Sequence, residues 1–145
     1  MADTSYQREV ERWVRDTWMP ATFGVSFAEQ SLRLRSGGMF NFDAVSTDGL
    51  IVANISTSSV KIASGKHGVG KTMKIRSDML FLLMASCARR IVVFTERDMH
   101  DWWMGEAGRG RVPNEIEFQH ARLPTSMAAG LTAARSRASD EVRAR

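Results

Sequence analysis

The feature that most constrains the fold is a run of alternating apolar and polar residues interrupted by two glycine-containing turns. Residues 31–35 alternate leucine with arginine, Gly37-Gly38 turns the chain, and residues 39–45 place two phenylalanines on one face. Asp48-Gly49 marks the second turn, because both residues tolerate the positive φ of a tight hairpin. Residues 50–57 follow as a mostly apolar third strand, typical of the centre of a sheet. The pattern predicts three consecutive strands joined by hairpins.

Helical and strand patterns flank this unit on both sides. The spacing of apolar residues predicts an amphipathic helix over 6–18, ended by Pro20, and a buried helix over 75–86. Thr95 and Asp98 resemble the capping box that opens a helix. Two further strands are expected, at residues 91–94 and 116–123. The predicted order is α-βββ-α-β-α-β, so the expected fold class is α/β with a mixed central sheet flanked by helices.

Length and composition bound the organisation of the chain. Its 145 residues suit one globular domain, which we expect to span residues 1–124. Large apolar residues become scarce over residues 125–145, which predicts a C-terminal tail or a weak helix. A single cysteine, Cys87, excludes a disulfide framework. The longest apolar run, residues 79–88, is too short to cross a membrane, so we expect a cytoplasmic protein with no membrane partner.

The basic residues are unevenly distributed along the chain. The formal net charge is +4, and all four lysines lie between residues 61 and 74, whereas the other basic residues are arginines. A compact ammonium suits phosphate neutralisation, so we interpret Lys66 and Lys71 as phosphate-binding candidates. Nucleic acid is then the expected partner. A solvated basic loop is the alternative interpretation.

Part of this basic stretch matches the phosphate-loop pattern GxxxxGK[ST]. It reads Gly-Lys-His-Gly-Val-Gly-Lys-Thr at residues 65–72. In that motif backbone amides surround phosphate oxygens, while the lysine and the hydroxyl bind phosphate and Mg2+. The expected context is missing, because three strands joined by turns precede the segment and Glu96, not an aspartate, follows the strand at 91–94. Nucleotide binding through Gly65 to Thr72 is therefore an alternative function.

The hairpin carries a second pattern. It reads Gly37-Gly38-x-Phe40-x-Phe42-Asp43-Ala44-Val45, then Asp48-Gly49, then Ile-Val-Ala-Asn-Ile-Ser at residues 51–56. This pattern resembles the core of the PD-(D/E)XK nuclease superfamily, the restriction-endonuclease-like class, and the predicted element order over residues 5–95 agrees with that core. The resemblance implies a restriction-endonuclease-like fold with metal-dependent phosphodiester hydrolysis. In that superfamily an aspartate on the second strand and an acid-x-Lys triplet on the third bind the metal and activate a water.

Three residues correspond to the superfamily motif. Asp43 occupies the aspartate position, Asn54 the acid position and Ser56 the lysine position. The motif is therefore degenerate at two positions, because an amide oxygen brings no charge to a hard cation and a serine brings no cation to the attacking hydroxide. Asp43 and Asn54 also allow structural interpretations, as a polar residue near a strand end and as a hydrogen-bonded amide. We expect their side chains to lie beside each other on adjacent strands.

Residues outside the motif can replace what it lacks. Some members of the superfamily supply the lysine from a neighbouring helix, a place that Lys74 or Lys71 fits, and the acid from the first helix, which Glu11 or Glu9 fits. The resemblance therefore implies Mg2+ or Mn2+ held by Asp43, Asn54 and Glu11, with Lys74 and Ser56 as further catalytic candidates. The expected function is nuclease-like binding or processing of nucleic acid, with phosphodiester hydrolysis weakened or lost because the motif is degenerate. A non-catalytic interaction module stays open as an alternative, as does a homodimer.

Overall fold

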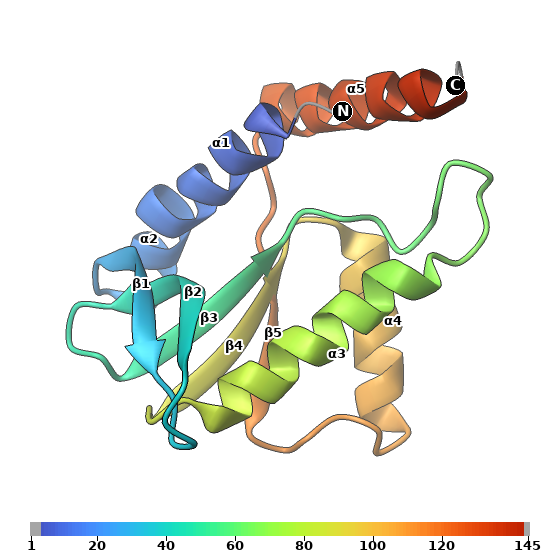
Figure 1. Cartoon of the computed structure of the whole chain (residues 1–145). Helices are drawn as coiled ribbons and strands as arrows, with labels where there is room; N and C mark the ends of the chain where they lie inside the picture. The colour runs from blue at the N-terminus through green and yellow to red at the C-terminus, as the bar shows by residue number, and fades with distance from the viewer. Residues whose placement is uncertain (1–3, 144–145) are drawn as a thin grey trace.

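Five strands form one mixed sheet in the computed structural model, which describes residues 4–143 and the side chains of residues 4–138 (Figure 1). The elements are α1 (Ser5–Trp13), η1 (Val14–Trp18), α2 (Met19–Phe23), β1 (Phe27–Arg33), β2 (Met39–Ser46), β3 (Ile51–Ser56), α3 (Val69–Met84), β4 (Arg89–Phe94), α4 (Arg97–Gly108), β5 (Ile116–His120) and α5 (Thr125–Arg143). The strands lie in chain order, antiparallel from β1 to β3 and parallel from β3 to β5. The α/β class with a mixed central sheet is thus confirmed.

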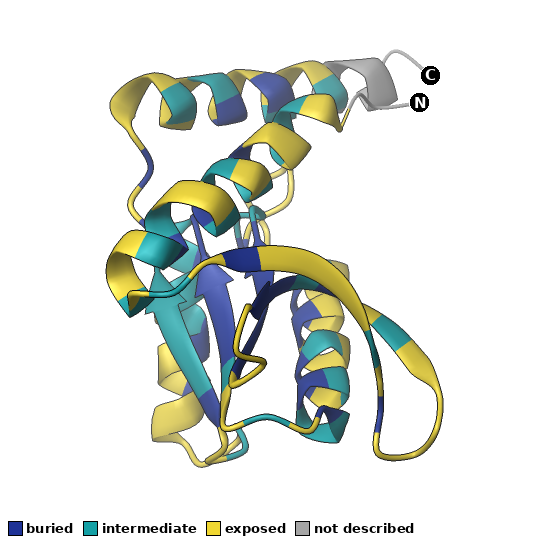
Figure 2. Ribbon diagram, turned by 90° about the vertical axis from the view of Figure 1, so that its left-hand side faces the viewer, coloured by how far each residue is buried: buried dark blue, intermediate teal, exposed yellow. Residues whose placement is uncertain are grey.

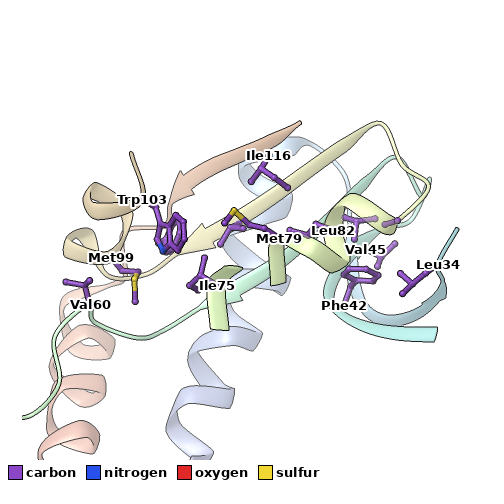
Figure 3. Close-up of a cluster of buried hydrophobic side chains, with 14 residues drawn as sticks. Leu34, Phe42, Val45, Val60, Ile75, Met79, Leu82, Met99, Trp103 and Ile116 are labelled. Carbon is purple, nitrogen blue, oxygen red and sulfur yellow. The ribbon is translucent and has the colours of Figure 1, made fainter. Parts of the chain in front are cut away.

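The two faces of the sheet carry separate hydrophobic cores. On one face, Val52 of β3 belongs to the core that α3 and α4 cover, where Trp103 is fully buried (Figure 3). On the other face, the next residue, Ala53, belongs to the core covered by α1 and α5, with Val10 and Leu131 fully buried. Each large side chain buried in this way contributes about 2–3 kcal/mol. Figure 2 shows the result, with buried central strands and exposed outer surfaces of the helices.

The first helix does not end at Pro20, so that prediction is wrong. α1 continues through the π-helical turn η1 into α2, and the chain leaves the helix only at Gly24, which has φ 72°. Proline lacks an N–H, and its ring crowds the carbonyl four residues earlier, which normally breaks an α-helix. A π-helical turn directly before Pro20 widens the helix and accommodates the ring. The continued helix keeps both Val14 and Met19 buried against the sheet.

A β-bulge and an early end of strand pairing distort the sheet at β2. The pairing of β2 with β1 shifts so that one β1 residue lies opposite two β2 residues, Asp43 and Ala44. β2 pairs with β3 at only two positions, Ala44 with Ala53 and Val45 with Val52. Beyond them the two strands separate. This strand fork has Asp43 on one side and Asn54 on the other.

Several predicted element boundaries also differ from the structure. α3 begins at Val69, well before residue 75, because the basic segment with its lysines joins the helix. The predicted capping box is wrong, since Glu96 precedes α4 without a capping bond and Thr95 Oγ1 donates instead to the Ser56 carbonyl. β5 ends at His120, short of residue 123. At Thr95 a tertiary contact thus replaces the local preference on which the prediction relied.

The C-terminal segment forms the helix α5, one of the two predicted options. It crosses α1, and Tyr6 Oη donates to the Met127 carbonyl at 3.3 Å. A Cβ atom at Gly130 would lie 2.1 Å from the Tyr6 hydroxyl oxygen, so this close approach requires glycine. Over the described part of the chain, no helix combines the length and the apolar character needed to cross a membrane.

Candidate active site

Asp43 and Asn54 lie side by side across the strand fork, as the sequence predicts. The backbone N–H of Asp43 donates to Asn54 Oδ1 at 3.3 Å, and the backbone N–H of Ile55 donates to Asp43 Oδ2 at 2.8 Å. These bonds connect β2 to β3 where the regular ladder has stopped, because the bulge has turned Asp43 toward the neighbouring strand. The bonds fix the Asp43 carboxylate at the mouth of the fork.

The first helix brings Glu11 and Arg15 to the same place. Arg15 Nη1 donates to the Asp43 carbonyl oxygen at 3.3 Å, and the arginine side chain is only 14% exposed. Glu11 precedes Arg15 by four residues and therefore lies on the same side of the helix. Its carboxyl group is close enough to interact electrostatically with both Asp43 and Lys74. The helix thus supplies one acid and one cation to the fork.

Helix α3, on the other face of the sheet, supplies Lys74 and Asp78. Lys74 Nζ lies 3.2 Å from Asp78 Oδ2, and the side chains are 70% and 13% exposed, respectively. The negative charge of Asp78 also acts on Asp43, as the positive charge of Lys74 does. We call Glu11, Asp43, Lys74 and Asp78 the fork site. It combines three acids and one lysine from three elements.

Burial raises the pKa of all three carboxyl groups of the fork site. It raises the pKa of Glu11 to about 7, where the charge of Asp43 adds to the rise and Lys74 opposes it. The pKa of Asp43 is raised by burial and lowered in part by the bond from Ile55, and the pKa of Asp78 is raised by burial against the effect of Lys74. Desolvated acids that repel each other favour binding of a further cation.

Glu11 and Asp43 are the two carboxyl groups that could hold a divalent cation at the fork site, since the charge of Asp43 acts on Glu11. Mg2+ is usually held by one or two carboxylates, with water and substrate phosphates as the remaining ligands. Among the described residues, no three side chains of histidine, cysteine, aspartate or glutamate are arranged to hold one ion. Two carboxylates with water are therefore the ligand set that the fork site can offer.

Asn54 does not fit the role of metal ligand that the sequence predicts for it. Its Oδ1 already accepts the Asp43 N–H, and its buried Nδ2 has no hydrogen-bond partner. An amide nitrogen donates hydrogen bonds and does not ligate a hard cation. Asn54 therefore brings a buried donor and no charge to the position where the resemblance in the sequence leads us to expect an acid.

The other predicted residues make their contacts elsewhere. Ser56 Oγ accepts the Ser58 N–H at 3.5 Å, at the carboxyl end of β3. Lys66 is exposed on the loop between β3 and α3. Lys71 Nζ donates to the Lys61 carbonyl at 3.0 Å, on the side of α3 nearest this loop. Glu9 is exposed on α1, so Glu11 is the acid that reaches the fork.

The phosphate-loop pattern lies in a more suitable context than the sequence indicates. It connects β3 to α3, and α3 leads into β4, which runs parallel to β3. Two contacts nevertheless differ from those of a nucleotide site. Thr72 Oγ1 donates to the Val69 carbonyl of its own helix at 3.0 Å, and Glu96 pairs with Arg135 at 2.9 Å. The hydroxyl and the acid that would hold Mg2+ are thus engaged by other groups.

Sequence reasoning missed two residues at the fork, Arg15 and Asp78. Both have a signal in the sequence, because each lies four residues after a predicted site residue, Glu11 and Lys74, on a helix. Residues with this spacing lie on the same side of a helix and meet the same surroundings. Extending each candidate by one helical turn would have found them.

Comparison with known proteins adds no identification to this geometry. No protein-family model, no curated protein and no solved structure matches the chain.

Proposed function

We propose that the chain is a metal-dependent nucleic-acid hydrolase of the restriction-endonuclease-like class, with the fork site as its active site. The observation that carries the proposal is the position of Asp43. Its carboxylate accepts the Ile55 N–H at the point where β2 and β3 separate, and the charges of Glu11 and Lys74, on helices that cover opposite faces of the sheet, act on the same region. The α-βββ-α-β order of residues 5–94 supports the same class.

Each residue of the fork site has a role in this reaction. Bound Mg2+ or Mn2+ would stabilise charge on the phosphate and lower the pKa of the attacking water. Glu11 and Asp43 would hold the cation, as their burial and mutual repulsion favour. Lys74 is mostly exposed and can reach a phosphate to neutralise its charge, taking the role of the lysine that Ser56 replaces. Asp78 pairs with Lys74 at 3.2 Å and positions its ammonium group.

The test is cleavage of labelled single- and double-stranded DNA and RNA in the presence of Mn2+. Wild-type protein should cleave at least one of these substrates, and Asp43→Asn should lose at least 100-fold of the rate because it removes a charged metal ligand, a loss of about 3 kcal/mol in transition-state stabilisation. Lys74→Met should lose a comparable factor. Lys74→Arg keeps the charge but not the compact ammonium, and we expect it to retain substrate affinity with a lower rate.

A matched control excludes a contaminating nuclease. Asp101→Asn makes the same chemical change on the exposed surface of α4 and should retain full activity. Absence of cleavage by the wild type, or equal cleavage by the Asp43 and Asp101 variants, would contradict the proposed function.

A further inference from the structure

A second polar feature lies one helical turn from the fork site, toward the N-termini of α1 and α3. It is a pocket of about 570 Å³ between the first turns of α1, the loop over residues 57–68, and α5. Figure 1 shows this loop rising from α3 toward α5. Its lining includes Gln7, Lys61, Lys71, Thr132 and Arg135. We call it the basic pocket.

Among the side chains that the structure describes, three cationic ones and no acidic one line the basic pocket. Lys71 Nζ donates to the carbonyl of Lys61 at 3.0 Å, which fixes one ammonium on the pocket wall. Arg135 is held by Glu96 Oε1 at 2.9 Å and by the Thr57 carbonyl, so its guanidinium is anchored too. Burial and the charge of Arg135 both lower the pKa of Lys71. Cations held this close repel each other, and a bound anion would relieve that repulsion.

Three further groups define the polarity of the pocket. The buried Oε1 of Gln7 has no hydrogen-bond partner, and as an acceptor it can pair with a hydroxyl or N–H group of a ligand but not with a phosphate oxygen. Two acids lie close to the cations: Glu96 pairs with Arg135 at 2.9 Å, and Asp98, whose carboxylate accepts the Ser59 hydroxyl at 2.5 Å, acts on Lys71. Two acids against three cations leave this set of charges positive. A phosphate group suits it, since lysine and arginine supply both charge and charge-assisted hydrogen bonds.

The spacing of residues connects the basic pocket to the fork site. On α1, Gln7 in the pocket precedes Glu11 at the fork by four residues. On α3, Lys71 in the pocket precedes Lys74 at the fork by three residues. Residues three and four apart are neighbours on one side of a helix. On each helix the pocket residue and the fork residue are therefore separated by about one turn, about 5.4 Å along the axis. A nucleic-acid strand can therefore reach both sites with nearby phosphates.

We propose that the basic pocket binds a backbone phosphate of the same nucleic-acid strand whose reacting phosphate lies at the fork site. The binding of phosphate is argued from the pocket alone, whereas the cleavage of the same strand at the fork site rests on the proposed function. The pocket fixes the register and direction of the strand and carries no sequence information, as phosphate contacts generally do. A free nucleotide offers the same phosphate chemistry, so the test must distinguish a nucleotide from a nucleic-acid strand as the source of the bound phosphate.

The test compares two double variants of equal charge. Lys61→Gln with Lys71→Gln removes two cations from the pocket, and Arg122→Gln with Arg137→Gln removes two exposed cations, one just before α5 and one on it, outside the pocket lining. Affinity for a labelled 12-nucleotide single strand is measured by anisotropy in EDTA over a series of salt concentrations. The pocket variant should bind about tenfold more weakly, with the slope of log affinity against log salt reduced by about 0.7 for each lost contact. The control should change affinity less than twofold.

A second pair of variants keeps the test informative if the double lysine variant does not fold. Ser136→Glu places an acid in the pocket from an exposed position of α5, and Ala133→Glu places one on the same helix outside the pocket lining. Only the Ser136 variant should weaken binding. Equal effects of pocket and control variants, in both pairs, would overturn the proposal, because the loss would then follow net charge alone.

Titration with pyrophosphate and with ATP distinguishes the source of the phosphate. Binding of ATP that is lost in the pocket variant, together with no binding of the strand by the wild type, would overturn the assignment to a strand and favour a nucleotide. The cleavage assay separates the two proposals. If no substrate is cleaved but the pocket variants still differ from their controls, hydrolysis is excluded and the phosphate site is supported.

Discussion

Asn54 Oδ1 accepts the backbone N–H of Asp43, while the Nδ2 of the same amide is buried without a partner. The amide therefore does two things at the strand fork. It holds the bulged residue of β2 in place, and it keeps a second polar atom, Nδ2, buried without an acceptor. A buried amide hydrogen without an acceptor costs about 1–3 kcal/mol, a cost that a ligand oxygen would remove.

Asn54→Asp replaces this unpartnered donor with a charged oxygen of the same size. In metal-free buffer we expect it to destabilise the protein by about 2 kcal/mol, because a fourth carboxylate joins three that are already desolvated. Mn2+ should restore the lost stability, and calorimetric titration should show at least tenfold higher affinity than in the wild type. Asn114→Asp, the same change at an exposed turn, is the control. Equal Mn2+ affinities of wild type and Asn54→Asp would place this position outside a metal site.

The raised pKa of Glu11 predicts how stability depends on pH without metal. The pKa rises from 4.5 to about 7 on folding, so the native state binds more protons than the unfolded state between these values. Stability should therefore fall as pH rises from about 5 to 8, by about 1–2 kcal/mol after allowing for partial solvent screening. Asp43 and Asp78 act in the same direction.

Glu11→Gln should flatten this pH dependence and raise stability at pH 8. The measurement is urea unfolding at a series of pH values in EDTA. Glu9→Gln, on the exposed side of α1, should keep the wild-type slope. An unchanged slope in Glu11→Gln would mean that the carboxyl ionises as freely in the folded chain as in the unfolded one.

The close packing of Gly130 against Tyr6 predicts that Gly130→Ala changes the free energy of unfolding in opposite directions with and without the Tyr6 side chain. Gly130→Ala puts a Cβ 2.1 Å from Tyr6 Oη, so the ring must move and its bond to Met127 is lost, at a cost of about 1–3 kcal/mol. With Tyr6→Ala the clash is absent, and Gly130→Ala should stabilise by up to about 1 kcal/mol through helix propensity. Thermal unfolding of the four proteins measures both values. The same effect of Gly130→Ala in both backgrounds would contradict the packing of α5 on α1.

The order of elements could be read from the sequence because short-range patterns determine it. The alternation over residues 31–57 and the turn at Asp48-Gly49 correspond to β1, β2 and β3. The helix through Pro20 could not be predicted, because a local rule for proline does not anticipate a π-helical turn that accommodates the ring. The start of α3 was missed for a similar reason, since the basic segment has a weak apolar pattern and gains its helical structure by packing on the sheet.

The candidate site was only partly predictable. Asp43 and Asn54 follow from hairpin geometry, because a tight turn fixes which residues of two strands meet. The partners of Asp43 depend on how two helices cross opposite faces of the sheet, and spacing along the chain carries no information about that. The resemblance points to Glu11 and Lys74, whereas Arg15 and Asp78 have a signal only in their spacing of four residues from these candidates, and the packing of α1 and α3 shows their contacts.

The proposed function depends on a divalent-cation site formed by Glu11 and Asp43 at the strand fork. Calorimetric titration with Mn2+ measures the affinity and the stoichiometry of this site. Wild-type protein should bind one Mn2+ per chain with affinity at least tenfold higher than Asp43→Asn or Glu11→Gln, since each variant removes a charged oxygen from a pair. Asp101→Asn should bind as the wild type does. If the wild type binds no Mn2+, or if all four proteins bind it equally, the fork site is not a metal site and the proposed hydrolysis does not take place there.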